Sequence, residues 1–237
     1  MKPYYENENG KLYHGDCLEI IPELEKVDLV LTDPPYSEKT HQGIRTNKGG
    51  GSAMRGMTQK GKFNLNFNSL TDDEFKTMCV ACLSISKGWV VMTCDHLHAP
   101  LMFKHKAFVR LGAWMKNNPM PQISADRPGQ GHEAVLILHS GVVEKRWARG
   151  GSSAIWRTNV CRKALIPTQK PTSLIISFIQ DFSLAGDVVL DPHLSSGTTA
   201  VACEELNRKW IGIEISEEHC EIAAKRIETE NRQLKMF

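Results

Sequence analysis

Residues 188–200 read Val188-Val-Leu-Asp191-Pro-His-Leu-Ser-Ser-Gly197-Thr-Thr-Ala200, which is a short apolar strand, a turn of small residues and the start of a helix. A second apolar strand follows, Lys209-Trp-Ile-Gly-Ile-Glu214, and it ends in a carboxylate. This order is typical of dinucleotide-binding folds, in which a tight turn brings a ligand close to the backbone and an acid binds ribose hydroxyls. The full Gly-x-Gly-x-x-Gly pattern is missing, which argues against a cofactor with a pyrophosphate. Taken alone, the segment fits an ordinary helix N-terminus equally well.

Short apolar runs extend this pattern toward both ends of the chain. Those that predict strands are 27–31, 89–92, 134–138, 188–190 and 210–215. Helical segments lie between them: a capping box at Thr71–Glu74 precedes 75–85, Pro171 opens a helix to Phe182, and Ser216 precedes a C-terminal helix. The alternation predicts an α/β fold with a single doubly wound, mostly parallel sheet and helices on both faces. We expect residues 1–237 to form one domain.

The composition excludes several classes of protein. The 237 residues are 41% hydrophobic and 24% charged, with a formal net charge of +2, which is ordinary for a globular protein. No run approaches the roughly 20 apolar residues that a membrane span needs, and the polar N-terminus is unlike a secretory signal. Seven cysteines without framework spacing favour a reducing cytoplasm over secretion.

A second motif, Leu29-Val-Leu-Thr-Asp33-Pro-Pro-Tyr36, follows the first long apolar strand. Asp33 falls at the carboxyl end of that strand, which is the edge where open α/β sheets bind ligands. The two prolines stiffen the turn and remove two N–H donors, so a carboxylate, carbonyl acceptors and an aromatic face are left. This set suits a flat substrate that carries an amino group. The alternative is an aspartate that caps a turn, with Tyr36 as packing.

Together the two motifs resemble the S-adenosylmethionine-dependent amino-methyltransferases of DNA, whose catalytic motif is Asp-Pro-Pro-Tyr and whose cofactor turn is Asp-Pro-Phe-x-Gly-x-Gly-Thr-Thr. The order, with the catalytic motif first, is similar to the permuted beta group. Further segments resemble the family in the same order: Tyr13-His-Gly-Asp16-Cys-Leu, Trp114-Met-Lys-Asn-Asn-Pro, His132-Glu-Ala-Val-Leu-Ile and Pro167-Thr-Gln-Lys170-Pro. The resemblance covers most of the chain and implies a Rossmann-like methyltransferase fold in a cytoplasmic enzyme, encoded by a bacterium or a phage.

The resemblance also implies a mechanism. The target base is flipped out of the duplex, Tyr36 stacks on it, and Asp33 and the carbonyl of Pro34 accept hydrogen bonds from its amine, which attacks the sulfonium methyl. The implied catalytic residues are Asp33, Pro34, Pro35 and Tyr36. The implied cofactor-binding residues are Asp16, Cys17, Thr168, Lys170, Asp191, His193, Ser195, Ser196, Gly197, Thr198, Thr199 and Glu214. Adenine is the favoured base. The alternatives are an enzyme that methylates cytosine amines or RNA, and a catalytically degenerate relative that binds DNA.

The chain departs from the family pattern in its cofactor turn. His193 stands where the family usually has Phe, and Ser195 stands where it has the first Gly. If the backbone at Ser195 is left-handed, a side chain there costs on the order of 1 kcal/mol. Cofactor binding that tolerates Ser195 is the favoured interpretation, and weak cofactor binding is the alternative.

A short basic segment, 140–166, stands in place of a full recognition domain and is too small for an independent domain. A second basic segment, 37–69, is expected to be a mobile loop, from which recognition could be borrowed. We expect phosphate contacts from their basic residues, Arg45, Lys48, Arg55, Lys60, Arg146, Arg149 and Arg157, with solvated surface as the alternative. Sequence specificity should therefore be short or loose.

Other residues with chemical potential have simpler interpretations. Cys79 and Cys82 lie inside a predicted helix and favour buried packing over a metal site. The segment Cys94–His98 follows a predicted strand and favours a structural or substrate-side role, so no metal is expected. DNA is the expected partner, a membrane is not, and a homodimer is left open.

Overall fold

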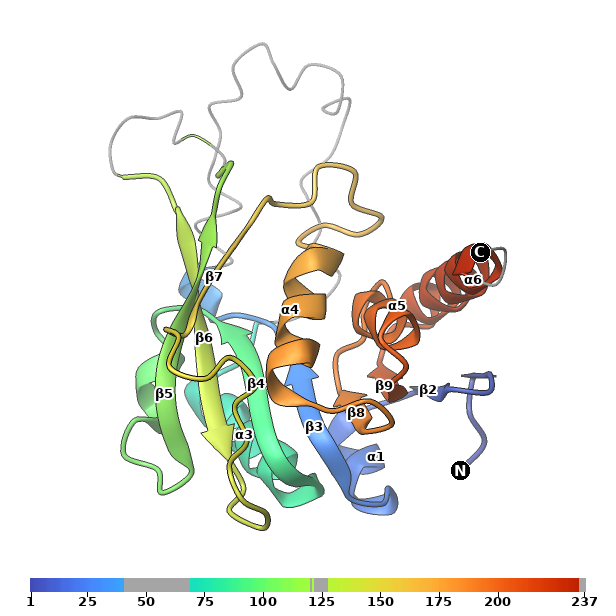
Figure 1. Cartoon of the computed structure of the whole chain (residues 1–237), viewed down its shortest axis with the longest axis horizontal. Helices are drawn as coiled ribbons and strands as arrows, with labels where there is room; N and C mark the ends of the chain where they lie inside the picture. The colour runs from blue at the N-terminus through green and yellow to red at the C-terminus, as the bar shows by residue number, and fades with distance from the viewer. Residues whose placement is uncertain (41–68, 120, 122–127, 235–237) are drawn as a thin grey trace.

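The computed structural model describes residues 1–40, 69–119, 121 and 128–234 (Figure 1). These residues form one nine-stranded sheet with the order β1-β2-β9-β8-β3-β4-β6-β5-β7. Its strands are β1 (Tyr5–Glu6), β2 (Gly10–His14), β3 (Val27–Thr32), β4 (Ser86–Cys94), β5 (Phe108–Lys116), β6 (His132–His139), β7 (Ile155–Thr158), β8 (Val188–Asp191) and β9 (Lys209–Glu214).

The middle of the sheet is parallel from β2 through β9, β8 and β3 to β4. Strand β6 then runs antiparallel between β4 and β5, β7 pairs parallel with β5, and β1 pairs antiparallel with β2. The predicted strands correspond to β3, β4, β6, β8 and β9. Strands β1, β2, β5 and β7 were not predicted, because they lack a continuous apolar run; β5, for example, carries Arg110 and Gly112 at its centre.

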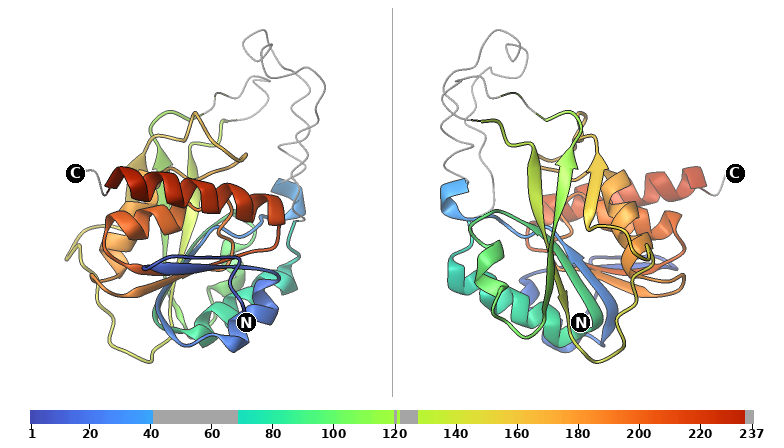
Figure 2. Two further views of the ribbon diagram at one scale, coloured as in Figure 1. Left: turned by 90° about the vertical axis from the view of Figure 1, so that its right-hand side faces the viewer. Right: turned by 60° about the vertical axis from the view of Figure 1, so that its left-hand side comes forward.

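Helices cover both faces of the sheet (Figure 2). One face carries α1 (Cys17–Ile20), the 3₁₀ turns η1 (Ile21–Glu23) and η3 (Ala99–Met102), and α3 (Asp72–Ile85), around a core that includes Phe75. The other face carries α4 (Thr172–Phe182), α5 (Thr198–Glu205) and α6 (Glu217–Leu234), around a second core that includes Phe178. The predicted capping box at Thr71 and Glu74 is present at the start of α3. Cys79 and Cys82 are buried core residues of α3.

The topology gathers the chemically interesting residues at one edge. Asp33, Asp191 and Glu214 follow or end the parallel strands β3, β8 and β9, so they share the carboxyl edge of the sheet. Because β6 runs in the opposite direction, its first residues reach the same edge, where Ala134 pairs with Cys94 of β4. In the described parts of the chain, no helix combines the length and the apolar character needed to cross a bilayer.

Candidate active site and cofactor turn

Asp191 organises the turn between β8 and α5. Its buried carboxylate accepts a hydrogen bond from the backbone N–H of His193 at 3.0 Å and another from the hydroxyl of Thr199 at 2.6 Å. Burial raises the pKa of Asp191 to about 6, despite these hydrogen bonds. Gly197 has a φ of +79°, and a Cβ built there would lie 3.2 Å from the Cβ of Ala223. The turn therefore requires glycine at position 197 for both its conformation and its space.

Ser195 is also left-handed, with a φ of +52°. Its backbone N–H donates to Glu214 at 2.8 Å, and the N–H of Ser216 donates to the other carboxylate oxygen at 2.9 Å. Burial pulls the pKa of Glu214 upward, but hydrogen bonds from His219 and from these two backbone groups outweigh burial and lower it. Glu214 is therefore a fixed, ionised carboxylate at the end of β9.

The rest of the turn is tied to α6. The hydroxyl of Thr198 accepts a hydrogen bond from Arg226 at 2.9 Å, and the backbone carbonyl of Ser196 accepts one from the same guanidinium at 3.2 Å. Ser196, Thr198 and Thr199 are all buried. Arg226 thus holds Ser196 and Thr198, and Asp191 holds Thr199, which fixes the shape of the turn.

His193 connects the turn to the end of β3. Its Nδ1 lies 3.1 Å from the hydroxyl of Thr32, the residue before Asp33, and its Nε2 lies 3.9 Å from the sulfur of Cys17. Burial lowers the pKa of His193 to about 4, so the imidazole is neutral near pH 7. Asp16, at the start of α1, is exposed and accepts a hydrogen bond from the N–H of Leu18 at 2.8 Å. Burial raises the pKa of the Cys17 thiol to about 11.

Asp33 is surrounded by donors. The Tyr36 hydroxyl lies 3.1 Å from Oδ1, and the hydroxyl of Thr93 from β4 also donates to Oδ1. The ammonium of Lys170 lies 2.5 Å from Oδ2. Pro34 is buried and Pro35 is partly buried, which fixes the turn between Asp33 and Tyr36. The predicted catalytic motif is thus assembled at the carboxyl edge of the sheet.

Glu133 and Lys116 complete this cluster, and the sequence reasoning missed both as site residues. Glu133 Oε2 accepts from the Tyr36 hydroxyl at 2.7 Å and lies 3.3 Å from Lys170, while Oε1 lies 2.7 Å from Lys116. Burial raises the pKa of Glu133, but the two ammonium groups outweigh burial and lower it to about 2. Burial and the neighbouring carboxylates raise the pKa of Tyr36 well above its usual value, so its phenol stays neutral.

Asp95 anchors the chain immediately after the catalytic motif. One carboxylate oxygen accepts from the Ser37 N–H at 2.9 Å, from the Ser37 hydroxyl and from the Thr40 hydroxyl at 2.7 Å. The other accepts from the N–H groups of Leu97 and His98. Burial raises the pKa of Asp95, but these hydrogen bonds outweigh burial and lower it to about 2. Asp95 therefore has a structural role, because it holds the chain that follows Tyr36.

Two predicted cofactor residues come from the segment before α4. Lys170 is buried, and its ammonium contacts Asp33 and Glu133. Thr168 is exposed and has a φ of +68°, an uncommon conformation for a β-branched residue. The structure thus places Lys170 beside the carboxylates of Asp33 and Glu133, a position that the sequence alone did not indicate.

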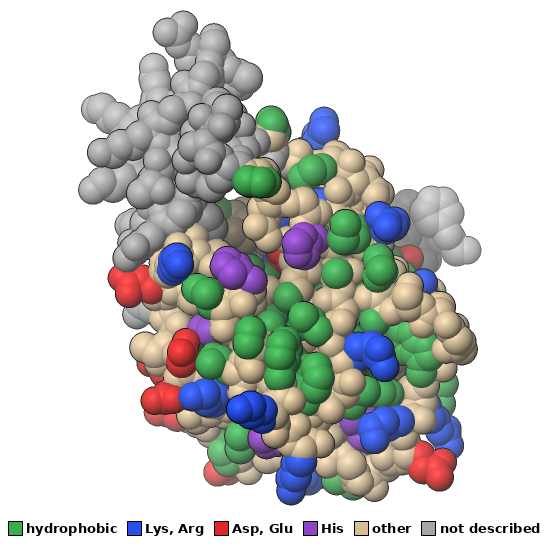
Figure 3. All heavy atoms as spheres, turned by 90° about the vertical axis from the view of Figure 1, so that its left-hand side faces the viewer, with side chains coloured by type: hydrophobic (Ala, Val, Ile, Leu, Met, Phe, Trp, Pro, Cys, Tyr) green, Lys and Arg blue, Asp and Glu red, His purple; other side chains and the backbone are tan. Residues whose placement is uncertain are grey.

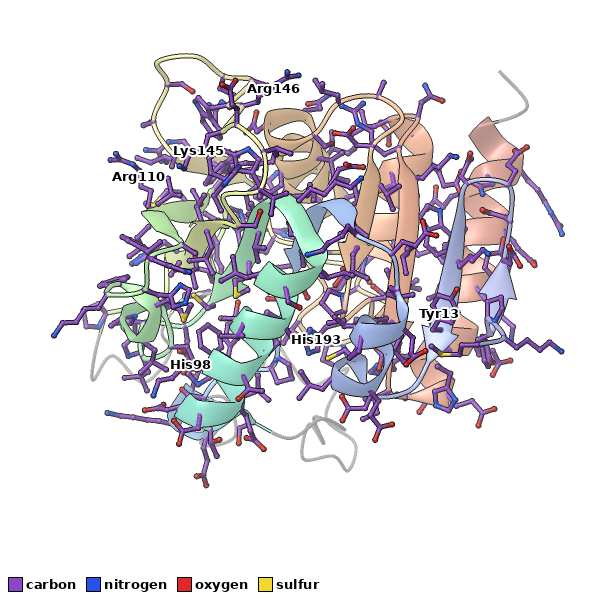
Figure 4. The ribbon with its side chains drawn as sticks, turned by 90° about the horizontal axis from the view of Figure 1, so that it is seen from below. Tyr13, His98, Arg110, Lys145, Arg146 and His193 are labelled. Carbon is purple, nitrogen blue, oxygen red and sulfur yellow. The ribbon has the colours of Figure 1, made fainter. Side chains whose placement is uncertain are left out.

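The three described arginines predicted to contact phosphates lie in different places. Arg146 lies beside the amino end of β4, because its backbone carbonyl accepts a hydrogen bond from Trp89 Nε1 at 2.7 Å. Figure 4 shows Arg146 with Lys145 and Arg110 at one corner, well away from His193. Trp89 lies near the amino end of β4, so Arg146 lies toward the edge of the sheet opposite to the one that carries Asp33.

Arg149 and Arg157 flank an open groove of about 560 Å³ between β7 and α4. Arg149 lies 3.6 Å from Asp181 and over the rings of Trp147 and Trp156, whereas Arg157 is exposed near the carboxyl edge. The groove contains none of the predicted catalytic residues. Figure 3 shows another face, where lysines and arginines stand separately around hydrophobic side chains. Arg45, Lys48, Arg55 and Lys60 lie outside the described residues.

A comparison with protein families matches residues 27–225 to the family described as DNA methylase. The chain belongs to the DNA methylase family. The matched range includes Asp33, Glu133, Lys170 and the whole cofactor turn. Membership confirms the family expected from the sequence, the S-adenosylmethionine-dependent DNA amino-methyltransferases.

Curated relatives of this DNA methylase are type II methyltransferases. M2.DpnII of Streptococcus pneumoniae is 26% identical over 258 residues, which cover 97% of this chain and 94% of that protein. M.HinfI of Haemophilus influenzae is 27% identical over 242 residues, which cover 90% of this chain and 67% of that protein.

Solved structures confirm the predicted fold class. The M1.HpyAVI complex with S-adenosylmethionine has a TM-score of 0.65 and 26% identity, and the match covers 92% of this chain and 99% of that one. The cytosine-N4-specific PvuII DNA methyltransferase has a TM-score of 0.71 and 17% identity, and the match covers 98% of this chain and 94% of that one. The second likeness concerns the fold alone.

Proposed function

We propose that this DNA methylase transfers a methyl group from S-adenosylmethionine to the exocyclic amine of adenine in DNA. The observation that carries the proposal is the Asp33 carboxylate, which Thr93, Tyr36 and Lys170 hold at the carboxyl edge of the sheet. An aromatic amine is a weak nucleophile because its lone pair is delocalised into the ring. Acceptors that bind both of its N–H groups favour a more tetrahedral and more nucleophilic nitrogen.

The residues around the turn fit S-adenosylmethionine. Glu214 offers an ionised carboxylate for the ribose hydroxyls. The side chain of Asp16 is exposed, and its oxygens can accept from the adenine amine. The imidazole of His193 is neutral and so adds no positive charge near a sulfonium. The cofactor supplies an electrophilic methyl group when it is bound.

In the proposed reaction, the chain binds and orients the target. The carboxylate of Asp33 accepts one N–H of the amine, and the carbonyl of Pro34 accepts the other. The ring of Tyr36 stacks on the extrahelical base, and its hydroxyl is already fixed by Asp33 and Glu133. Positioning the nitrogen in line with the methyl group then supplies much of the rate.

DNA binding in this proposal uses phosphate contacts at the carboxyl edge, with Arg157 as the described candidate. Segment 140–166 is too short for a separate domain, and part of it packs at the opposite edge, on residues near the start of β4. Base contacts are therefore few, and the enzyme reads a short or loose sequence, because phosphate contacts position DNA without specifying its sequence.

Methyl-labelled S-adenosylmethionine and duplex DNA test the proposal. The wild-type protein and Asp33→Ala are each incubated with long natural DNA, which is then digested to nucleosides. Label in N6-methyladenine with the wild type alone supports the proposed function. Label in N4-methylcytosine would establish the cytosine alternative, and unlabelled DNA from the wild type would reject both. Mapping the modified positions on the same DNA tests specificity, and a strict site of about five or more base pairs would contradict loose readout.

A further inference from the structure

Lys170 is the most heavily engaged cation in the described part of the active site. Its side chain is 8% exposed, and its ammonium lies 2.5 Å from Asp33 and 3.3 Å from Glu133. The same ammonium is 5.3 Å from the centre of the Tyr36 ring. A lysine so buried costs desolvation energy unless its charge is paired, and here it contacts two carboxylates at once. Lys170 therefore contacts Asp33, the carboxylate that accepts from the target amine in the proposed function.

The number of acceptor positions on Asp33 indicates which of its oxygens can bind a further donor. An ionised carboxylate offers about four lone-pair positions, two on each oxygen. On Asp33 Oδ1, Thr93 donates one hydrogen bond, and the Tyr36 oxygen, 3.1 Å away, takes up the space beside the other lone pair, although its single proton has its shorter contact, 2.7 Å, with Glu133. On Oδ2, the donor found among the described residues is Lys170. One lone-pair position on Oδ2 is left for a further N–H donor. The ammonium of Lys170 fixes the direction in which that position points.

We propose that Lys170 is a positioning residue for methyl transfer, which clamps Asp33 and Glu133 together and directs the remaining acceptor position of Asp33 Oδ2 toward the target amine. The inference rests on the proposed function, because it gives Asp33 the role of amine acceptor. It differs from the role that the family resemblance implied, which counts Lys170 among the cofactor-binding residues.

The charged surroundings explain what removal of the ammonium would do. The titratable groups around Lys170 are Asp33 and Tyr36 after β3, Lys116 at the end of β5 and Glu133 of β6, while Asp191 at the end of β8 faces Asp33. Burial alone would lower the pKa of Lys170, but the two carboxylates raise it, so the ammonium persists. Without it, the described cation left beside the two carboxylates is Lys116, which contacts Glu133 and is not paired with Asp33, so one of the two carboxylates takes up a proton more readily. A protonated Asp33 loses acceptor capacity for the amine.

The kinetic test uses Lys170→Met, which removes the charge, and Lys170→Arg, which keeps it. We expect kcat to fall about 10- to 100-fold in Lys170→Met, as for other residues that orient catalytic groups. The acid limb of its pH–kcat profile should move to higher pH, while cofactor affinity by calorimetry stays within about threefold of wild type. Lys170→Arg should restore the position of the acid limb. A fall of more than about tenfold in cofactor affinity, with an unmoved acid limb, would overturn the proposal.

A second readout does not depend on activity. The Tm of wild type, Lys170→Met and Lys170→Gln is measured from pH 4 to pH 8. In the two neutral variants, one carboxylate of the Asp33–Glu133 pair has a higher pKa in the folded state than in wild type. The stability that comes from its proton is present at low pH and is lost as pH rises. The loss of Tm relative to wild type should therefore be largest near pH 8 and shrink toward pH 4. A loss that is equal at every pH would overturn the clamp. A wild type without methyl transfer would reject the proposed function, while the Tm series would still decide the clamp.

Discussion

Replacing Ser195 with glycine should stabilise the protein. Ser195 has a φ of +52°, and its hydroxyl makes none of the hydrogen bonds found among the described residues. A side chain in the left-handed region costs roughly 1–2 kcal/mol, whereas the extra freedom of glycine in the unfolded chain costs about 0.4–1 kcal/mol. The net gain is about 0.5–1 kcal/mol. For a chain of this size, that gain corresponds to a Tm increase of about 1–4 °C.

Thermal unfolding followed by circular dichroism measures this change. The matched control is Ser152→Gly, because Ser152 is exposed, directly follows a turn and is not among the residues with a positive φ. The control should lose stability by about 0.4–1 kcal/mol, since it gains only unfolded-state freedom. If Ser195→Gly lowers Tm as much as the control does, the left-handed backbone at Ser195 is not a source of strain and the reasoning fails.

Four further predictions concern the site. Asp33→Ala should lower kcat at least about 100-fold with cofactor affinity unchanged within about threefold, because the carboxylate orients the amine; a calorimetric titration provides the control. Tyr36→Ala should lose base stacking worth roughly 1–3 kcal/mol in kcat/KM. Tyr36→Phe should lose less, and equal losses would refute stacking. Arg157→Ala should reduce the slope of log affinity against log salt by about 0.9, whereas Arg146→Ala should leave it unchanged. Asp191 has a folded-state pKa raised to about 6, so its contribution to stability is lost as pH rises through that value. Asp191→Asn should therefore flatten the dependence of Tm on pH between about 4 and 6, and an unchanged slope would contradict it.

The sequence was sufficient to predict the shared position of Asp33, Asp191 and Glu214. Each follows or ends an apolar strand, and parallel strands place their carboxyl ends at one edge. The position of Glu133 could not be obtained in this way, because it depends on the antiparallel register between β5 and β6, where Trp114 pairs with Glu133. No local pattern encodes that register.

Two details of the turn show the same limit. The sequence identified Ser195 as a departure whose cost depended on its backbone, and only the structure supplied the left-handed φ. His193 was identified as a substitution, but its contacts with Thr32 and Cys17 join segments that are distant in the sequence. In both cases the residue was predictable and its neighbours were not.

The chain between the catalytic motif and α3 leaves and returns at adjacent points, since the N–H of Leu70 lies 3.3 Å from the carbonyl of Tyr36. Closing a loop across a fixed gap costs only about 0.6 kcal/mol more for each doubling of its length. A change in the number of residues between Thr40 and Leu70 should therefore cost the sheet little, whereas Ser37 and Thr40 have to stay, because Asp95 holds them. We expect the chain after Thr40 to accept a foreign DNA-reading segment while the residues around Asp33 stay in place.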